Sequence, residues 1–172
     1  IRPIITRGIG DLGLDPRKLT DKYAAYWEHN VAHTMINYEH CVANPKGFKG
    51  YGENCWGLTA SYSVNGYDAH MPSNDQGVIS PTAALSSFPY SPEQSMRAAR
   101  YFYENLGDKL MGPYGFYDAF SETAGWFPQR YLAIDQGPIV VMIENYRSGL
   151  LWNLFMKDAD IQRGLQKLGF SF

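Results

Sequence analysis

The sequence predicts an all-α domain, and three observations favour this class. Hydrophobic residues make up 45% of the 172 residues and charged residues 19%, which suits a packed core and argues against disorder. Apolar residues recur at helical spacing in several segments, and helix-starting residues stand in front of most of them. Strand signals are weak and scattered. No internal repeat or clear linker divides the chain, so we expect residues 1–172 to form a single domain.

The first predicted helix begins at Thr20 and Asp21, because a hydroxyl caps free amides and an acid suits the positive end of a helix. Its apolar face is formed by Ala24, Trp27, Val31, Met35, Tyr38 and Val42. Asn44-Pro45 ends it, since a residue before proline disfavours the helical conformation. Two shorter helices are expected over residues 54–61 and 81–88.

The next helix is predicted to begin at Ser91, with Pro92 in its first position and Gln94 completing a capping box. Its apolar face is expected to hold Met96, Ala99, Tyr103 and Leu106. A glycine at position 107 is a natural helix end.

The third long helix is predicted from Pro138 to about Met156. It is apolar nearly all round, which is typical of a helix buried on most sides. A short final helix should cover residues 159–168, with Ile161, Leu165 and Leu168 facing inward.

Two long loops, over residues 62–80 and 107–137, separate the predicted helices. Long ordered loops in a compact domain are usually functional. The second loop is rich in aromatic rings and carboxylates, so it either extends the core or lines a cleft.

Composition excludes several functions. The net charge of −2 and the absence of a basic stripe make nucleic acid an unexpected partner. The apolar stretches are too short to span a bilayer. Asp68, His70 and Asp75 could bind a metal or a sugar, but one histidine without a second at ligand spacing is a weak metal signal, so we expect no metal. No nucleotide, dinucleotide or serine-hydrolase motif is present, and no cofactor is expected. Cys41 and Cys55 are expected to be buried thiols, with a disulfide as the alternative.

The aromatic residues point toward sugars. The chain has 13 Tyr, 9 Phe and 4 Trp. Tyrosine and tryptophan near carboxylates and amides suit a sugar, because the ring stacks on the apolar face while polar groups bind hydroxyls. A large aromatic core is the alternative.

Two acids lie in or beside the third long helix. Glu144 stands among apolar residues, where a lone buried carboxylate is costly. It either pairs with Arg147 one turn on or faces a pocket. Asp135 precedes the helix, whose positive end would stabilise the charged form and suit a base or a nucleophile. An ordinary capping role is the alternative.

Two further acids lie in loops. Asp118 is surrounded by aromatic residues, which should raise its pKa as a general acid requires, unless backbone amides in a turn bind it. Glu53, Asn54 and Trp56 supply an acid, an amide and a ring within one turn. The alternative for Glu53 is a capping role.

Four segments, at residues 52–61, 114–120, 131–138 and 143–152, together resemble the glucoamylase-like family of bacteria. That family includes endo-β-1,2-glucanases, and related domains occur in cyclic β-1,2-glucan synthases. The resemblance extends from about Gly13 to Met156. It implies an (α/α)6 barrel, or toroid, with the substrate cleft at one end of the inner helices. This chain offers about half of the helices in such a barrel, so we expect it to be the C-terminal half of a larger catalytic domain, with the N-terminal half as its partner.

The resemblance also implies roles for particular residues. The acids expected in or near the cleft are Glu53, Asp118, Asp135 and Glu144. The residues expected to bind the sugar are Trp56, Tyr114, Phe116 and Tyr131 by stacking, and Asn54, Gln136 and Arg147 by polar contacts.

We therefore expect a hydrolase of β-glucan, β-1,2-linked, that uses carboxylate acid–base catalysis on an oligo- or polysaccharide. Asp135 is assigned the base role, and Asp118 or Glu53 the acid role. The alternatives are a non-catalytic carbohydrate-binding module and a domain of a cyclic glucan synthase. The resemblance implies a periplasmic or secreted location.

Overall fold

The computed structural model describes residues 12–172, and helices dominate this part of the chain. The elements in chain order are α2 (Tyr26–Ala43), β1 (Ala60–Ser63), β2 (Gly66–Ala69), α3 (Pro81–Leu85), α4 (Pro92–Glu104), α5 (Gly107–Leu110), β3 (Met111–Gly112), β4 (Gly115–Phe116), α6 (Ala133–Ser148), α7 (Leu150–Phe155) and α8 (Ala159–Lys167). The predicted predominance of helix is confirmed. Two small antiparallel hairpins, β1–β2 and β3–β4, are additions that the sequence signals missed.

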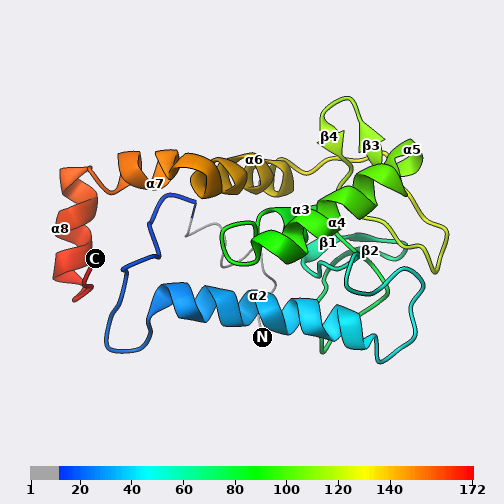
Figure 1. Cartoon of the computed structure of the whole chain (residues 1–172), viewed down its shortest axis with the longest axis horizontal. Helices are drawn as coiled ribbons and strands as arrows, with labels where there is room; N and C mark the ends of the chain where they lie inside the picture. The colour runs from blue at the N-terminus through cyan, green and yellow to red at the C-terminus, as the bar shows by residue number, and fades with distance from the viewer. Residues whose placement is uncertain (1–11) are drawn as a thin grey trace.

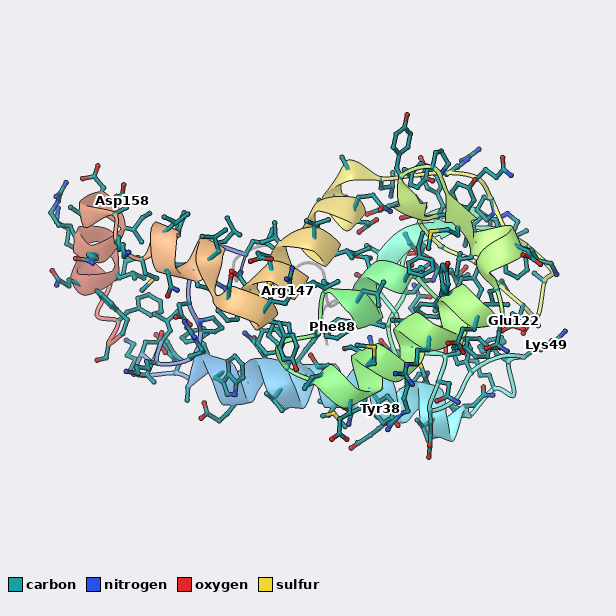
Figure 2. The ribbon with its side chains drawn as sticks, turned by 45° about the horizontal axis from the view of Figure 1, so that its top comes forward. Tyr38, Lys49, Phe88, Glu122, Arg147 and Asp158 are labelled. Carbon is teal, nitrogen blue, oxygen red and sulfur yellow. The ribbon has the colours of Figure 1, made fainter. Side chains whose placement is uncertain are left out.

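The helices lie in an elongated arrangement (Figure 1). Helix α2 runs along one long side, and α6 with α7 runs along the other. Helices α3 and α4 lie nearer one end with the two hairpins, while α8 stands at the opposite end. Figure 2 shows the same separation, with Asp158 at the start of α8 far from Lys49 and Glu122.

Helix α2 begins at Tyr26, so the predicted start at Thr20 is wrong. Asp21 instead accepts a hydrogen bond from the backbone N–H of Ala24 (2.9 Å) and forms a local turn. Thr20 pairs with Ser171 near the C-terminus through two backbone hydrogen bonds of 2.8 Å. The predicted end is confirmed, because Asn44 adopts the left-handed conformation there.

The buried face of α2 is also not the predicted one. Val31 and Met35 are half-buried, and Val42 is exposed. The face that packs inward holds Asn30, His33, Thr34, Asn37 and Cys41. Two of these buried side chains bind other segments: Asn30 donates to the hydroxyl of Tyr90 (3.3 Å) and Asn37 to the carbonyl of Leu58 (2.8 Å).

Helix α4 follows its predicted range, and Leu106 is buried as predicted, but within the helix the buried face is one position out of phase. Met96 and Tyr103 are exposed, whereas the buried residues are Ser95, Ala98 and Phe102. The capping box does not form. The Ser91 hydroxyl donates to the carbonyl of Ser87 (3.3 Å) inside the core instead of capping α4.

The third predicted helix is two helices. Helix α6 begins at Ala133, before Pro138, and ends where Gly149 adopts a left-handed φ of 68°. Helix α7 then starts at Leu150. The Asn145 side chain accepts from the amides of Leu151 (3.0 Å) and Trp152 (3.2 Å), which fixes this break.

The short predicted helices divide into correct and incorrect cases. Helix α3 confirms the one expected near residues 81–88, and α8 confirms the last one, with Leu165 buried. Leu168 is exposed, against expectation. The helix expected over residues 54–61 is wrong, because this segment forms a turn and then enters β1.

The main core lies between α2, α3, α4 and the extended segments 55–58 and 117–120. Its members are Cys41, Cys55, Trp56, Leu58, Ile79, Ala84, Ala98, Phe102, Leu106, Leu110, Tyr117 and Phe120. Both cysteines are buried free thiols, as predicted. The aromatic loop after α4 packs onto this core through Phe116, Phe127 and Tyr131, so much of it extends the core.

Candidate active site

Two buried carboxyl groups, those of Asp118 and Asp135, meet at the base of α6. Asp118 lies in an extended segment whose backbone N–H donates to the carbonyl of Arg130 (2.9 Å). Asp135 lies in the first turn of α6. Their exposed fractions are 1% and 0%, and the Asp118 carboxyl group lies close enough to that of Asp135 to raise its pKa. We call these two residues the acid pair.

The acid pair has few protein partners. The backbone N–H of Tyr62 on β1 donates to Oδ2 of Asp118 (3.1 Å). Thr82 donates to the backbone carbonyl of Asp135 (2.7 Å), which holds that turn of α6 rather than its carboxyl group. Within residues 12–172, Oδ1 of Asp118 and both carboxyl oxygens of Asp135 find no hydrogen-bond donor. Two negative charges in this setting would be strongly disfavoured, so the pair is expected to hold a proton.

Burial, and then contact with Asp118, raise the pKa of Asp135 from an ordinary 3.8 to about 8. This raised pKa differs from the sequence-based expectation that the N-terminus of the helix stabilises the charged form of Asp135. Loss of water and the neighbouring carboxylate outweigh the helix dipole, since no backbone amide of residues 12–172 reaches the Asp135 carboxyl group.

Aromatic and cationic side chains of hairpin β1–β2 and its surroundings stand around the acid pair. Tyr62 and Tyr67 are cross-strand partners whose rings lie 5.6 Å apart. The guanidinium of Arg130 lies 5.0 Å from the centre of the Tyr62 ring. His70 is fully buried nearby, and burial lowers its pKa, although Asp68 and other carboxylates oppose this.

Tyr62, Tyr67 and Arg130 were missed at the level of sequence, whereas His70 was named there as a candidate ligand. The signal available was Asn65-Gly66, a frequent hairpin pair, between short runs that contain Tyr62 and Tyr67. It predicts a hairpin, but the approach of that hairpin to Asp118 depends on tertiary structure.

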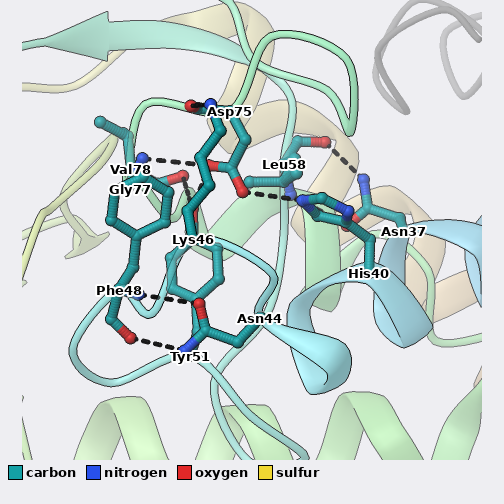
Figure 3. A network of polar contacts seen from close by, with 10 residues as sticks. All are labelled: Asn37, His40, Asn44, Lys46, Phe48, Tyr51, Leu58, Asp75, Gly77 and Val78. Atoms are coloured by element: carbon teal, nitrogen blue, oxygen red, sulfur yellow. Dashed lines mark hydrogen bonds and ion pairs between the residues drawn. The ribbon is translucent and has the colours of Figure 1, made fainter.

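A network of polar contacts around Asp75 fixes the loop that precedes residue 79 and leads into the site (Figure 3). The Asp75 carboxylate contacts His40 of α2 (2.8 Å) and accepts from the hydroxyl of Tyr51 (2.8 Å) and the amide of Gly77 (3.0 Å). Lys46 donates to the Asp75 carbonyl (2.7 Å). This network holds the segment before residue 79.

That segment is continuous with the acid pair through backbone pairing. Ile79 and Phe120 exchange two hydrogen bonds of 2.9 Å, close to Asp118. In parallel, the Asn37 side chain bonds both the amide (3.0 Å) and the carbonyl (2.8 Å) of Leu58. Polar residues of α2 therefore position the backbone on which the site is built.

Glu53 and Asn54 are exposed in a tight turn, where Gly52 and Cys55 exchange two hydrogen bonds of 3.1 Å. No hydrogen bond or ion pair of the described residues joins Glu53 to the acid pair. Glu53 is thus exposed in this turn, whereas Asp118 and Asp135 are buried.

Trp56 is fully buried, and its predicted stacking role is wrong. Its indole N–H donates to the carbonyl of Gln94 (3.2 Å), and its ring packs edge-on against Tyr38 at 5.6 Å. No face of the ring is open to a sugar, because the core of α2 and α4 covers it.

Glu144 and Arg147 form the ion pair that was one of the two predicted alternatives. Their side chains are 3.3 Å apart, and the Ser148 hydroxyl also donates to Glu144 (2.6 Å). The pair lies at the surface rather than in the interior. Glu144 is about 13 Å along α6 from Asp135 and roughly on the opposite face, so it stands apart from the acid pair.

The other predicted sugar contacts gather near hairpin β3–β4. A mainly apolar groove of about 490 Å³ between α4, α6 and this hairpin is lined in part by Tyr114, Phe116, Gln136 and Arg147. Gln136 donates to the carbonyl of Phe116 (2.9 Å). The ring of Tyr131 packs against Tyr114 at 5.6 Å.

Two other findings concern the described part of the chain. No group of three metal-ligating side chains occurs within residues 12–172. None of the helices there is both long and apolar enough to cross a membrane.

Comparisons with known proteins agree with the resemblance found in the sequence. The Glycoamylase family model, described as a glucoamylase, matches residues 2–159. An exo β-1,2-glucooligosaccharide sophorohydrolase of Parabacteroides distasonis is 52% identical over 159 residues, which are 91% of this chain and 22% of the relative.

Solved structures give the same result. The endo-β-1,2-glucanase of Chitinophaga pinensis, in complex with sophorotriose and glucose, is 60% identical with a TM-score of 0.97, over 99% of this chain and 41% of that one. A β-1,2-glucanase of Parabacteroides distasonis is 49% identical with a TM-score of 0.94, over 98% and 24%. The chain thus spans less than half of each of these relatives. On the extent and identity of these matches, the chain belongs to the Glycoamylase family.

Proposed function

We propose that the protein is a glycoside hydrolase that cleaves β-1,2-linked glucans, with the acid pair at its catalytic centre. The observation that carries this proposal is the meeting of two buried carboxyl groups, Asp118 and Asp135, because burial and the neighbouring carboxyl group raise the pKa of Asp135 to about 8, in the range that acid–base catalysis uses. The names of the relatives, a sophorohydrolase and two β-1,2-glucanases, supply the substrate class.

The closeness of Asp118 and Asp135 also argues against assigning the acid role to one of them and the base role to the other. Carboxyl groups that flank a scissile bond stand roughly 6.5–9.5 Å apart in inverting enzymes and about 5–5.5 Å apart in retaining enzymes. The Asp118 carboxyl group is near enough to that of Asp135 to raise its pKa, and both groups are buried. We therefore treat the acid pair as one unit on one side of the bond, in which the protonated member orients the ionised one.

The opposing carboxyl group would then come from another part of the protein. The relatives extend well beyond the region that this chain matches, and the C. pinensis chain is covered to only 41%. Our proposal includes completion of an (α/α)6 toroid by such a region, as the partner of residues 1–172. It also includes a periplasmic or secreted location, where a polymeric glucan is accessible.

The test is hydrolysis of β-1,2-glucan by Asp135→Asn and Asp118→Asn variants of the full natural protein that carries this sequence. Each variant removes an ionisable group from the acid pair with little change in size. We expect the rate of reducing-end release to fall by about 100-fold or more, as is usual for loss of general acid–base catalysis.

Glu104→Gln is the matched control, because Glu104 is an exposed carboxylate at the end of α4. It should keep the wild-type rate. Near-normal hydrolysis by Asp135→Asn would refute the central role of the acid pair. Calorimetric binding of the glucan without any hydrolysis by the wild type would favour the non-catalytic binding module.

A further inference from the structure

A third buried carboxyl group, that of Asp75, lies outside the acid pair and is not used by the proposed chemistry. Its side chain is fully buried. Oδ2 contacts Nε2 of His40 (2.8 Å), and Oδ1 accepts from the hydroxyl of Tyr51 (2.8 Å) and the amide of Gly77 (3.0 Å). Because both oxygens are engaged, Asp75 is suited to hold the backbone in place rather than to bind substrate (Figure 3).

The contacts of Asp75 fix the start of a segment, residues 77–82, that runs into α3. We call these residues the bracing segment. The Tyr51 hydroxyl that binds Asp75 also lies 3.3 Å from the carbonyl of Val78. Gly77 has a left-handed φ of 73°, and an atom of the Phe48 ring lies 2.6 Å from where a Cβ would stand. Hydrogen bonds to one carboxylate and a close packing contact therefore set the path of the chain here.

The bracing segment contacts the backbone that carries each member of the acid pair. Ile79 exchanges two hydrogen bonds of 2.9 Å with Phe120, which is two residues after Asp118. At the other end of the segment, the Thr82 hydroxyl donates to the backbone carbonyl of Asp135 (2.7 Å). One short segment thus joins the extended chain of Asp118 to the first turn of α6.

The geometry of the acid pair depends on this connection. Asp135 keeps its raised pKa only while its carboxyl group is excluded from water and close to that of Asp118. Displacing a catalytic group by about 1 Å can cost on the order of 100-fold in rate. Contacts that fix the bracing segment therefore affect both the proton affinity and the alignment of the acid pair.

We propose that Asp75, held by His40 and Tyr51, is a positioning residue for the acid pair and acts through the bracing segment. Its loss should lower the rate of the bond-breaking step rather than the affinity for the glucan, since it has no free oxygen with which to bind a sugar. The inference rests on the proposed function. If Asp75 served only to stabilise the fold, weakening its contacts would lower stability and leave kcat unchanged.

The test uses Tyr51→Phe in the full natural protein that carries this sequence, with Tyr26→Phe as the matched control. Tyr51→Phe removes one hydroxyl and keeps the ring that packs against Phe48 at 5.3 Å. Tyr26→Phe removes a hydroxyl that donates to a different aspartate, Asp21 (3.0 Å), at the start of α2. With Tyr51→Phe we expect kcat on β-1,2-glucan to fall about tenfold and KM to change less than about twofold. Tyr26→Phe should keep both wild-type values.

His40→Ala breaks the same network independently, because it removes the contact with Oδ2 of Asp75. It should also lower kcat more than it changes KM. Wild-type kcat in both Tyr51→Phe and His40→Ala would overturn the positioning role. An equal fall in kcat with Tyr26→Phe would overturn it as well, because the effect would then follow from lost stability alone.

A second readout does not depend on hydrolysis. The free energy of unfolding in urea is measured between about pH 4 and about pH 8 for each protein, with and without Asp135→Asn, so that the difference reports Asp135 alone. Other titratable groups near Asp75 cancel in this difference; they are His40, Cys41, Lys46, Tyr51 and His70. The pH dependence of the difference should be smaller in Tyr51→Phe than in the wild type, because the pKa of Asp135 moves toward its ordinary value.

This readout separates the two proposals. If the wild type hydrolyses no β-1,2-glucan, the proposed function fails, and the titration of Asp135 decides the positioning role. A smaller pH-dependent difference in Tyr51→Phe, with the wild-type difference in Tyr26→Phe, would support it. The same difference in Tyr51→Phe as in the wild type would refute it.

Discussion

At the residue scale, the surroundings of each carboxyl group decide its role. Asp75 and Asp135 are both buried, but Asp75 receives hydrogen bonds from three directions while the Asp135 carboxyl oxygens receive none from described donors. Glu144 lies at the surface beside a cation. The pKa of Asp135, raised to about 8, therefore suits proton exchange near neutral pH.

The raised pKa of Asp135 predicts how stability depends on pH. The folded state holds a proton up to a pKa of about 8, whereas the ordinary value is 3.8, so between these values it binds more protons than the unfolded state. Stability from this group is therefore full below about pH 4 and is lost as the pH rises to about 8. The slope is at most about 1.4 kcal/mol per pH unit.

Urea unfolding of wild type and Asp135→Asn across this pH range measures the effect. The variant has no group to titrate at position 135, so its stability should fall less over the range. Parallel pH profiles for the two proteins would contradict the raised pKa.

At the element scale, packing against neighbours overrides local helix signals. Helix α2 buries a polar face because Asn37 and His40 bind the backbone and the carboxylate of adjoining segments. Gly149 divides α6 from α7, because its left-handed conformation stops one helix while Asn145 caps the next.

Two glycine-to-alanine changes test this view of the helices. Gly149→Ala should destabilise the protein by about 1–2 kcal/mol, because a side chain disfavours a φ of 68° and the new Cβ would lie 3.2 Å from Asn153. Gly164→Ala, within α8, should stabilise it by about 0.5–1 kcal/mol, since the added Cβ meets nothing within 4 Å. Urea denaturation measures both, and shifts of the same sign would refute the assignment of Gly149.

At the scale of the whole molecule, apolar surface remains exposed on the described residues. On the α6–α7 side, Val140 is 71% exposed and Leu154 is 57% exposed. An apolar hollow of about 710 Å³ lies among α6, α7 and α8, lined in part by Leu154 and Phe155. Surfaces of this kind are typical of interaction sites.

Residues 1–172 expressed alone are therefore expected to bind a hydrophobic dye such as ANS and to self-associate. The full natural protein that carries this sequence should do neither to the same degree, because the proposed toroid covers these surfaces. Dye fluorescence and size-exclusion chromatography measure the difference. A monomeric fragment with no dye binding would contradict the expectation.

The sequence by itself determined the predominance of helix, the positions of α3, α4 and α8, and the family, because these depend on local signals and on motifs in order along the chain. It also identified Asp118 and Asp135 as candidates. Only the tertiary structure decided that these two meet, that Trp56 is closed off in the core and Glu144 lies at the surface, and that hairpin β1–β2 lines the site. Proton affinity and access depend on which distant segments exclude water from a group, and no local pattern records that.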